Sequence, residues 1–595
     1  MLNPERLGAE KNPVFSSGEA LGRVISVSGS KASIGFLLVS KKSSHQLRAT
    51  VGKFVGIASG GSLLVGVITE VSLNISAPAR EQGYFAAGNL DLLGEIKEDQ
   101  NGRPGFVRGL REYPAVGDPS GLLAYQALKL VYGARHADMI EIGDLNQDST
   151  VGAFIDVQET LTKHFAVLGT TGVGKSTAVA LILQRMLSAR PHLRIFLLDA
   201  HNEYERCFGD VAQVANPSNM KLPFWLFNFE ELVDVIFAGR PGDADELEIL
   251  SEVLPLAKGK YARLRSTQDR LSARKAGGGF TVDTPVPYVL QDLVTLIDER
   301  MGRLENRPTR VKYQKLISRI ETVRNDPRYA FMFANANVGG DTMGEVISQL
   351  FRLPANGKPM TIMQLAGFPA EVVDAVVSVL GRLAFEFGLW SDGAVPLLFV
   401  CEEAHRYAAA DRSLGFGPTR KAISRIAKEG RKYGIFLGLV TQRPSELDPT
   451  ILSQCSTLFV MRMTNERDQE IVRAAVSDAA TNLLDFVPAL GTAEVFAFGE
   501  GIAMPARLSF KQLPAHLLPC NEPVGEAKVD PRRGINPDFI ATVLERWRGA
   551  MMSQKPGSDD IMETEQLVAV RSPPLQSAAG AHRAPLLRRP LHPGL

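Results

Sequence analysis

The spacing of hydrophobic residues changes along the chain. From Gly22 to about Pro119, short runs of Val, Ile, Leu and Phe are separated by Gly, Ser and Asn, as in GRVISVSGSKASIGFLL. This pattern is typical of short antiparallel strands and predicts a small β-barrel or sandwich. From about Phe165 to Leu508, apolar runs of strand length alternate with longer helical segments. The alternation predicts a parallel α/β sheet, with strands at HFAVLG, RIFLLDA, TIMQLAG, PLLFVCEE, GIFLGLVTQ, TLFVMRM and EVFAFG.

A helical pattern interrupts this alternation from about Asn219 to Gly340, in segments such as ELEILSEVLPLAKGKYARLR. No strand-like run occurs there, so the pattern predicts a mainly helical insertion. Residues 258–275 hold many basic side chains against the single acid Asp269: Lys258, Lys260, Arg263, Arg265, Arg270, Arg274 and Lys275. A solvated helix face is the simpler interpretation, and a contact with nucleic acid or a partner is the alternative.

The C-terminal end has a different composition. After a last predicted helix near Asn536 to Met551, the chain is rich in Pro, Ser and Ala, which predicts disorder. The expected domains are therefore a β-barrel over 1–135, a first core part over 136–218, the helical insertion over 219–340, a second core part over 341–520, and a helix with a tail over 521–595.

Composition narrows the class of protein. The 595 residues carry 66 Lys and Arg against 65 Asp and Glu, a net charge of +1, which argues against a histone-like binder. The four cysteines form no CxxC pair, so neither a disulfide framework nor a zinc knuckle is indicated. No signal-peptide core and no run of about 18 apolar residues is found. We expect a soluble protein of the reducing cytoplasm.

A glycine-rich loop follows the predicted strand His164–Leu168 and leads into the helical segment TAVALILQRMLSA. The loop matches GxxxxGK[ST] in the strand–loop–helix context that this motif requires. Its glycines let backbone N–H groups surround a triphosphate, and the helix N-terminus adds partial positive charge. A flexible turn is the alternative, but we expect ATP to bind at Gly169, Thr170, Thr171, Gly172, Val173, Gly174, Lys175, Ser176 and Thr177. Lys175 would neutralise β- and γ-phosphate oxygens, and Ser176 would be a ligand of Mg²⁺.

Two adjacent carboxylates end the apolar run PLLFVCEE. Beside a phosphate-binding loop, Glu402 can hold Mg²⁺ through its water shell and Glu403 can polarise the attacking water. Paired glutamates at a strand end are common on protein surfaces, so this expectation depends on the loop. Gln442 ends the next apolar strand, where its amide can sense the γ-phosphate or orient water. The alternative is an ordinary turn residue.

The segment TRKAISRIAKEGRK, residues 419–432, predicts a basic helix and its exit. A single basic helix is more often a solvated face. Rapid ATP hydrolysis nevertheless needs a cation for the transferring phosphoryl group, which the neighbouring subunit supplies in ring motors. Arg425 and Arg431 are the candidates. In LLDAHNEY, residues 201–203 follow the second strand at the same edge, as ordinary loop residues or as a link between nucleotide state and substrate.

Together, KHFAVLGTTGVGKST, LLDAHNEY, FVCEEAHRYA, EGRKYGIFLGLVTQRPSELDPTILSQC and the later TNERD resemble the HerA family of hexameric DNA-translocating ATPases, relatives of FtsK. The resemblance covers most of residues 140–510, and the N-terminal β segment looks like the family's barrel. It implies a RecA-like P-loop core with an extra strand between the two Walker strands. It also implies a homohexamer that pumps double-stranded DNA for a partner nuclease.

The resemblance assigns roles to single positions. Lys175 and Ser176 correspond to Walker A residues, Glu402 and Glu403 to the Walker B pair, and Gln442 to the sensor. Glu402 stands where Asp is usual in the family, so metal geometry or rate could differ. The arginine acting in trans maps only approximately, which leaves both Arg425 and Arg431.

Two functions remain open from the sequence. The first is an ATPase that translocates along or unwinds double-stranded DNA, acting with a separate nuclease or effector in DNA end processing or phage defence. The second is an ATP-stabilised ring that assembles and activates an effector with little translocation. A secretion or conjugation ATPase is disfavoured because no membrane anchor precedes the core. The effector, the role in repair or defence, and the polarity and step size stay open.

Overall fold

The computed structural model describes residues 20–519, apart from 38–48, 74–82, 99, 218, 241, 267–278, 304–306, 334–339, 367, 369, 412–414 and 477. All of these lie in one compact unit, Met1–Gly534. The helix expected near Asn536 to Met551 and the tail expected to be disordered lie outside the described residues. None of the described helices is long and apolar enough to cross a membrane.

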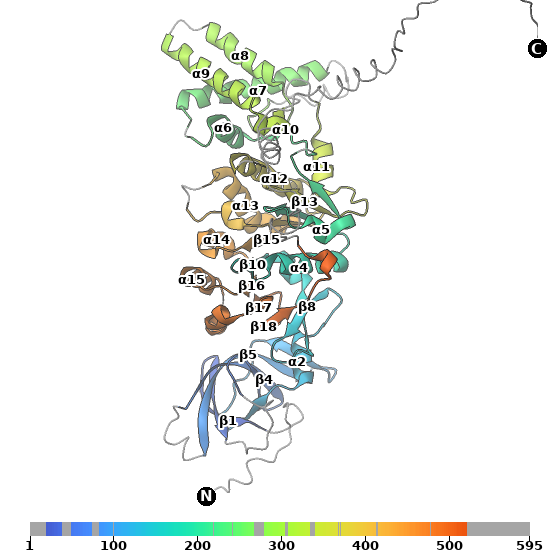
Figure 1. Ribbon diagram of the computed structural model, residues 1–595, viewed down its shortest axis with the longest axis vertical. Coiled ribbons are helices and arrows are strands. Elements are labelled where there is room, and N and C mark those ends of the chain that lie inside the picture. The colour runs from blue at the N-terminus through green and yellow to red at the C-terminus, as the bar shows by residue number, and fades with distance from the viewer. Residues whose placement is uncertain are drawn as a thin grey trace, which may run out of the picture. The chain divides into compact units, whose positions relative to one another are not determined.

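Six antiparallel strands close a barrel near the N-terminus (Figure 1). Around the barrel they are β2 (Lys31–Leu37), β1 (Gly22–Ser28), β7 (Pro119–Leu122), β3 (Phe54–Ser59), β4 (Ser62–Ser72) and β5 (Tyr84–Glu98), which returns to β2. β6 (Pro104–Arg108) pairs with β5 outside the ring. Val24, Ile34 and Ile57 are buried in the barrel core. The apolar runs therefore form a barrel rather than a sandwich.

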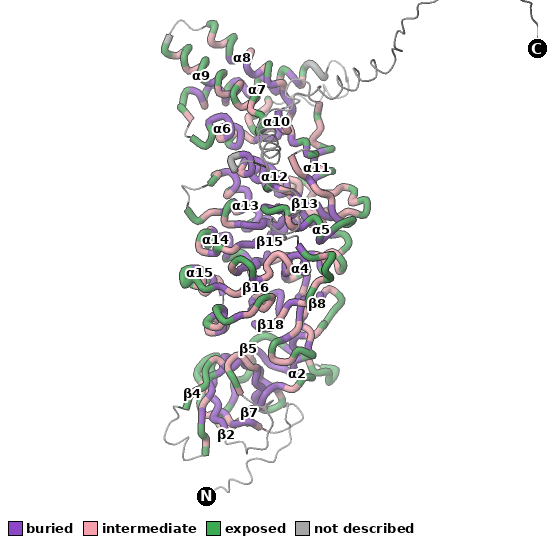
Figure 2. Tube along the Cα trace, in the orientation of Figure 1, coloured by how far each residue is buried: buried purple, intermediate pink, exposed green. Residues whose placement is uncertain are grey.

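An eleven-stranded sheet forms the core of the structure. Its first seven strands are parallel: β12 (Ala212–Ala215), β13 (Met360–Gln364), β11 (Arg194–Asp199), β14 (Leu397–Cys401), β15 (Ile435–Thr441), β10 (Phe165–Leu168) and β16 (Thr457–Met461). β10, β14, β15 and β16 are buried along their whole length, as their apolar sequences predict (Figure 2). β15 lies between β10 and β14, where the resemblance implies an extra strand.

The sheet is mixed, and the expectation of parallel pairing was wrong at one side. β17 (Glu494–Gly499), which is the predicted strand EVFAFG, runs antiparallel to β16. β18 (Ala506–Phe510), β8 (Met139–Leu145) and β9 (Gly152–Asp156) continue the antiparallel pairing. The hydrophobic pattern predicts a buried strand but not its direction, which depends on where the chain re-enters the sheet.

Helices and short 3₁₀ turns connect the strands of the core. The α-helices are α2 (Tyr125–Tyr132), α3 (Val157–Thr162), α4 (Lys175–Ala189), α5 (Glu205–Phe208), α11 (Met343–Phe351), α12 (Ala370–Trp390), α13 (Gly417–Glu429), α14 (Pro449–Leu452) and α15 (Glu466–Ala475). The 3₁₀ turns are η3 (Gly209–Val211), η6 (Ala404–Arg406), η7 (Gly430–Tyr433), η8 (Pro444–Glu446), η9 (Asp478–Ala489) and η10 (Ala515–Leu517).

The described part of residues 219–340 contains helices and turns but no strand. It contains η4 (Phe224–Leu226), α6 (Phe229–Phe237), α7 (Ala244–Ser266), α8 (Leu290–Gly302), α9 (Arg307–Arg324), η5 (Pro327–Tyr329) and α10 (Ala330–Phe333). α7, α8 and α9 pack side by side (Figure 1). The domain boundaries expected from the sequence stay a prediction.

The basic stretch 258–275 does not form one solvated face. Lys258 is buried, and its Nζ donates hydrogen bonds to the backbone oxygens of Val282 (2.6 Å) and Thr284 (2.7 Å). Burial lowers the pKa of Lys258 to about 8. Lys260 pairs with Asp292 at 2.6 Å. Lys258 is therefore part of the packing of the insertion, and residues 267–278 lie outside the described chain.

Candidate active site

The glycine-rich loop has the geometry of a phosphate-binding loop. Gly172 (φ 77°) and Gly174 (φ 99°) adopt left-handed backbone conformations that side chains disfavour. Gly174 is the N-cap of α4, so the first N–H groups of the helix are directed at the loop. Burial lowers the pKa of Lys175, while Glu403, Glu402 and Glu203 act in the opposite direction. Its Nζ donates to the Thr170 oxygen at 2.8 Å, within the loop that would hold the phosphates.

Neighbouring strands hold the loop in place. The Gly169 N–H donates to the Thr441 oxygen at 3.3 Å, at the end of β15. The Thr170 N–H and its hydroxyl both donate to the Arg462 oxygen, at 3.0 and 3.1 Å, just beyond β16. On the other side, the Ala493 N–H donates to the Val173 oxygen at 3.0 Å. The loop is thus pre-organised for phosphate binding.

Glu402 and Ser176 meet around one buried tyrosine. The Tyr204 hydroxyl donates to Glu402 at 3.2 Å and also forms a hydrogen bond with Ser176. Glu402 is 5% exposed and accepts the Ala200 N–H at 3.1 Å. Burial raises the pKa of Glu402 well above its usual range, and the nearby Asp199 and Glu203 add to this rise. A cation at this point would relieve the cost of the buried charge.

This donor set fits Mg²⁺. A carboxylate and a hydroxyl are hard oxygen ligands, and Mg²⁺ is usually held by one or two such groups together with phosphate oxygens and water. The described residues hold no group of three or more His, Cys, Asp or Glu that could form an all-protein metal site.

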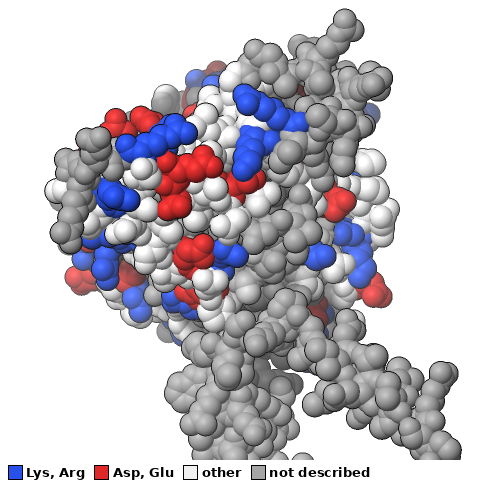
Figure 3. Space-filling model, turned by 90° about the horizontal axis from the view of Figure 1, so that it is seen from above, with Lys and Arg blue, Asp and Glu red and all other residues white. Residues whose placement is uncertain are grey.

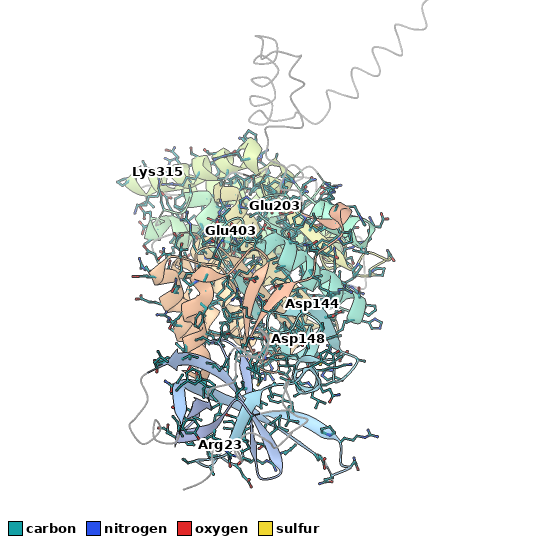
Figure 4. All side chains as sticks on the ribbon, turned by 60° about the horizontal axis from the view of Figure 1, so that its bottom comes forward. Arg23, Asp144, Asp148, Glu203, Lys315 and Glu403 are labelled. Carbon is teal, nitrogen blue, oxygen red and sulfur yellow. The ribbon has the colours of Figure 1, made fainter. Side chains whose placement is uncertain are left out.

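Glu403, labelled in Figure 4, contacts several polar side chains. Its backbone is left-handed (φ 51°, ψ 45°), a strained conformation that clusters at active sites. Gln442 Nε2 donates to Glu403 Oε1 at 3.0 Å, and Gln442 Oε1 accepts a hydrogen bond from the Thr171 hydroxyl. Gln442 therefore bridges the phosphate-binding loop and the glutamate. It reaches both because β15 lies between β10 and β14.

Two histidines flank the same carboxylate. His201 Nε2 lies 3.4 Å from Glu403 Oε1, and His405 Nδ1 lies 3.3 Å from Glu403 Oε2. The HNEY segment was expected at this edge, and Glu203 lies there as well (Figure 4). Burial lowers the pKa of His405, which favours the neutral imidazole.

The structure brings neither candidate arginine into the hydrogen-bonded group around Glu403 in the described residues. Arg425, on α13, places its guanidinium 4.1 Å from the centre of the Phe385 ring. Arg431, in η7, is exposed and precedes β15, whereas Gln442 follows the other end of that strand. Seven strand residues span roughly 20 Å. Arg431 therefore lies at the end of β15 opposite to the site of its own subunit, and a role of either arginine in a neighbouring site stays a prediction.

The sequence analysis did not single out four residues that shape the site. Asp199 accepts the N–H groups of Glu203 and Tyr204, both at 3.0 Å, and so forms the turn after β11. Tyr204, His405 and Thr441 contact the acidic pair or its neighbours. Asp199 and Thr441 are the last residues of apolar strands, which was the available signal. Tyr204 gave no signal of its own, because a single tyrosine cannot be distinguished in sequence from an ordinary aromatic core residue.

Comparison with known proteins shows what the chain is similar to. The family model "Helicase HerA, central domain" matches residues 140–384. The chain is 27% identical to the DNA double-strand break repair helicase HerA of Pyrococcus furiosus, over 65% of this chain and 72% of that protein. It is 26% identical to a probable helicase of Methanocaldococcus jannaschii, over 71% of this chain and 76% of that protein.

Solved structures with low sequence identity are also similar to the chain. VirB4 of Thermoanaerobacter pseudethanolicus has a TM-score of 0.44 and 15% identity, covering 65% of this chain and all of that one. The bacterial conjugative coupling protein TrwB has a TM-score of 0.42 and 14% identity, covering 67% and 94%.

The match to the HerA central-domain model and the phosphate-binding geometry together give the enzyme class. The loop presents helix N–H groups and a lysine, and a carboxylate and a hydroxyl lie beside it in the arrangement that ATP with Mg²⁺ requires. The chain is an ATPase whose cofactors are ATP and Mg²⁺.

Proposed function

We propose that this ATPase forms a ring of six identical subunits and uses ATP hydrolysis to translocate along, or unwind, double-stranded DNA. The joined network of Thr171, Gln442 and Glu403, in a chain that matches the HerA central-domain model, carries the proposal. It links the loop that would hold the γ-phosphate to the residue that would activate water. Relatives named as DNA double-strand break repair helicases support DNA as the substrate.

Each residue of the site has a task in hydrolysis. Lys175 binds β- and γ-phosphate oxygens, and Ser176 and Glu402 would hold Mg²⁺, which supplies positive charge to the phosphates. Glu403 accepts a proton from the attacking water. The oxygen of that water bonds to the γ-phosphorus, and the bond between the γ-phosphorus and the ADP oxygen breaks. Gln442 orients Glu403 by a hydrogen bond and contacts Thr171 of the phosphate-binding loop, so it would respond to the γ-phosphate. Arg425 or Arg431 of a neighbouring subunit would stabilise the transferring charge.

The motor would act in the cytoplasm with a separate nuclease or other effector, in DNA end processing or in phage defence. DNA binding would be local, because the net charge of the chain is only +1. On the face shown in Figure 3, Lys and Arg lie among Asp and Glu rather than in one basic field. A central pore would concentrate a few cations from each of six subunits around the duplex.

DNA-stimulated hydrolysis tests the proposal. We expect long duplexes to raise the ATPase rate and random sequences to compete equally, because a pore that follows phosphates does not read bases. Affinity should fall by orders of magnitude between about 50 and 200 mM salt if six or more phosphates are neutralised. An ATPase rate indifferent to DNA, with no duplex binding at about 50 mM salt, would favour a ring that only assembles and activates an effector.

A further inference from the structure

The two oxygens of Glu403 have different surroundings. Oε1 is engaged by Gln442 Nε2 at 3.0 Å, with His201 Nε2 at 3.4 Å. Oε2 is buried and has no hydrogen-bond partner. Since a buried carboxylate oxygen is costly to leave unpaired, Oε2 is the atom available to accept a proton from water.

His405 is the group beside this free oxygen. It lies in η6, directly after Glu403, and its side chain is only 11% exposed. Its Nδ1 is 2.9 Å from the Thr441 hydroxyl oxygen and 3.3 Å from Glu403 Oε2. If Nδ1 carried no proton, its lone pair would face the carboxylate and the two acceptors would repel each other. We therefore assign the proton of the neutral ring to Nδ1. The N–H is then donated to Thr441 and lies beside Oε2.

Thr441 gives the histidine a rigid anchor. It is fully buried at the end of β15, and its hydroxyl accepts the Arg443 N–H at 3.0 Å. Its backbone oxygen accepts the Gly169 N–H, the first residue of the phosphate-binding loop. One residue thus connects the loop to the histidine beside Glu403. The other charged groups that act on His405 are Glu446, Arg443 and Arg406.

We propose that His405, anchored by Thr441, is a positioning residue that keeps Oε2 of Glu403 in place to accept the proton of the attacking water. The left-handed backbone of Glu403 is itself strained, and the imidazole N–H limits where the free oxygen can move. The inference rests on the proposed function of Glu403 and adds a residue to it.

A pair of isosteric variants tests the proposal in the full-length chain. His405→Asn keeps an N–H donor at the δ position, whereas His405→Leu has nearly the same shape and no donor. We expect His405→Leu to lower kcat by roughly tenfold to a hundredfold, because a small misplacement of a catalytic group has that effect. KM for ATP and binding of a non-hydrolysable analogue should stay within about twofold, and His405→Asn should recover most of kcat.

Two further comparisons separate positioning from folding. His192→Leu makes the same chemical change at an exposed histidine outside the site and should leave kcat unchanged. Thr441→Val should lower kcat, Thr441→Ser should not, and Thr441→Val should add little in the His405→Leu background. The Thr441 pair also carries the test if His405→Leu does not fold.

The possible outcomes are distinct. Equal losses in the Asn and Leu variants, or a His405→Leu variant as active as His192→Leu, would overturn the role of the donor. If the unmodified chain hydrolyses no ATP with Mg²⁺, the proposed function itself fails and the inference fails with it.

Discussion

We expect Lys175 and Glu403 to have different roles in ATP hydrolysis. Lys175 is expected to contact phosphates in both the ground and transition states, so Lys175→Ala should weaken ATP binding and abolish turnover. Glu403→Gln keeps the size of the side chain but removes the base, so it should trap bound ATP while turnover falls roughly 10²-fold or more. Filter binding and phosphate release measure the two effects. Turnover within about tenfold of the unmodified chain in both variants would contradict the assignment.

His164 makes stability depend on pH. Its ring accepts the Leu437 N–H at Nδ1 (3.0 Å) and donates from Nε2 to the Ala427 oxygen (3.1 Å), so the folded state needs a neutral ring. Burial lowers the pKa of His164 to about 4. The unfolded chain, with an ordinary histidine pKa near 6.5, therefore binds more protons than the folded chain between about pH 6.5 and 4.

Acid should reduce the part of the unfolding free energy that depends on the neutral ring of His164. As pH falls from 6.5 towards 4, we expect up to ~3 kcal/mol of unfolding free energy to be lost through His164. His164→Asn suits the left-handed backbone (φ 57°) and cannot titrate, so its melting temperature should start lower at pH 7 but decline less with acid. Equal declines in the two proteins would show that His164 does not cause the pH dependence.

At the level of helices, one buried ion pair joins the insertion to the core. Glu231 of α6 is 1% exposed and accepts hydrogen bonds from Arg382 Nε (3.0 Å) and Nη2 (2.8 Å) of α12. Ser378 donates to the same carboxylate at 2.8 Å. The carboxylate also completes the capping box of α6 with Asn228. The pair thus positions α6 on α12.

Breaking this pair should destabilise the protein markedly. Arg382→Met leaves a buried carboxylate without its cation, and we expect a loss of about 3–5 kcal/mol in unfolding free energy. Lys421→Met removes an exposed pair with Glu230 from the same region and should change it by less than about 1 kcal/mol. Urea unfolding followed by circular dichroism measures both. Similar small losses in the two variants would mean that the buried pair does not hold the insertion.

At the scale of the whole assembly, the position of Arg431 limits which active site it can reach. The arginine lies about a strand length from its own site, so if it acts in hydrolysis, we expect it to do so in the site of a neighbour in a head-to-tail ring. Light scattering with ATP should show a mass six times that of one chain. Arg425→Ala should have the smaller effect, because Arg425 already packs on Phe385.

Mixed rings test the shared site directly. Lys175→Ala subunits keep Arg431, and Arg431→Ala subunits keep Lys175. An intact site therefore forms wherever the Lys175 of one subunit meets the Arg431 of the neighbour that completes its site. A one-to-one mixture should recover about a quarter of the normal sites, although each variant alone is inactive. Mixtures with Arg425→Ala provide the matched comparison. Rings that form but stay inactive in both mixtures would exclude both arginines.

Local pattern alone was enough to predict the phosphate-binding loop, the acidic pair and every parallel strand from β10 to β16 except the short β12. Each of these is encoded within a few neighbouring residues: a loop motif between a strand and a helix, or a short apolar run that must be buried. Gln442 was also predicted, because it directly follows such a run. What Gln442 touches was not predictable, because its partners lie far away in the chain.

Tertiary structure decided how these pieces meet. Strand order places β15 between β10 and β14, which brings Thr171, Gln442 and Glu403 together across 271 and 39 residues of sequence. The tertiary structure also determines that β17 pairs antiparallel with β16 and that Thr441 lies beside His405. It also buried Lys258 against two backbone oxygens, although its neighbours in sequence indicate a solvated basic helix. Hydrophobic periodicity shows which face of an element is buried, but only packing selects the partner it is buried against.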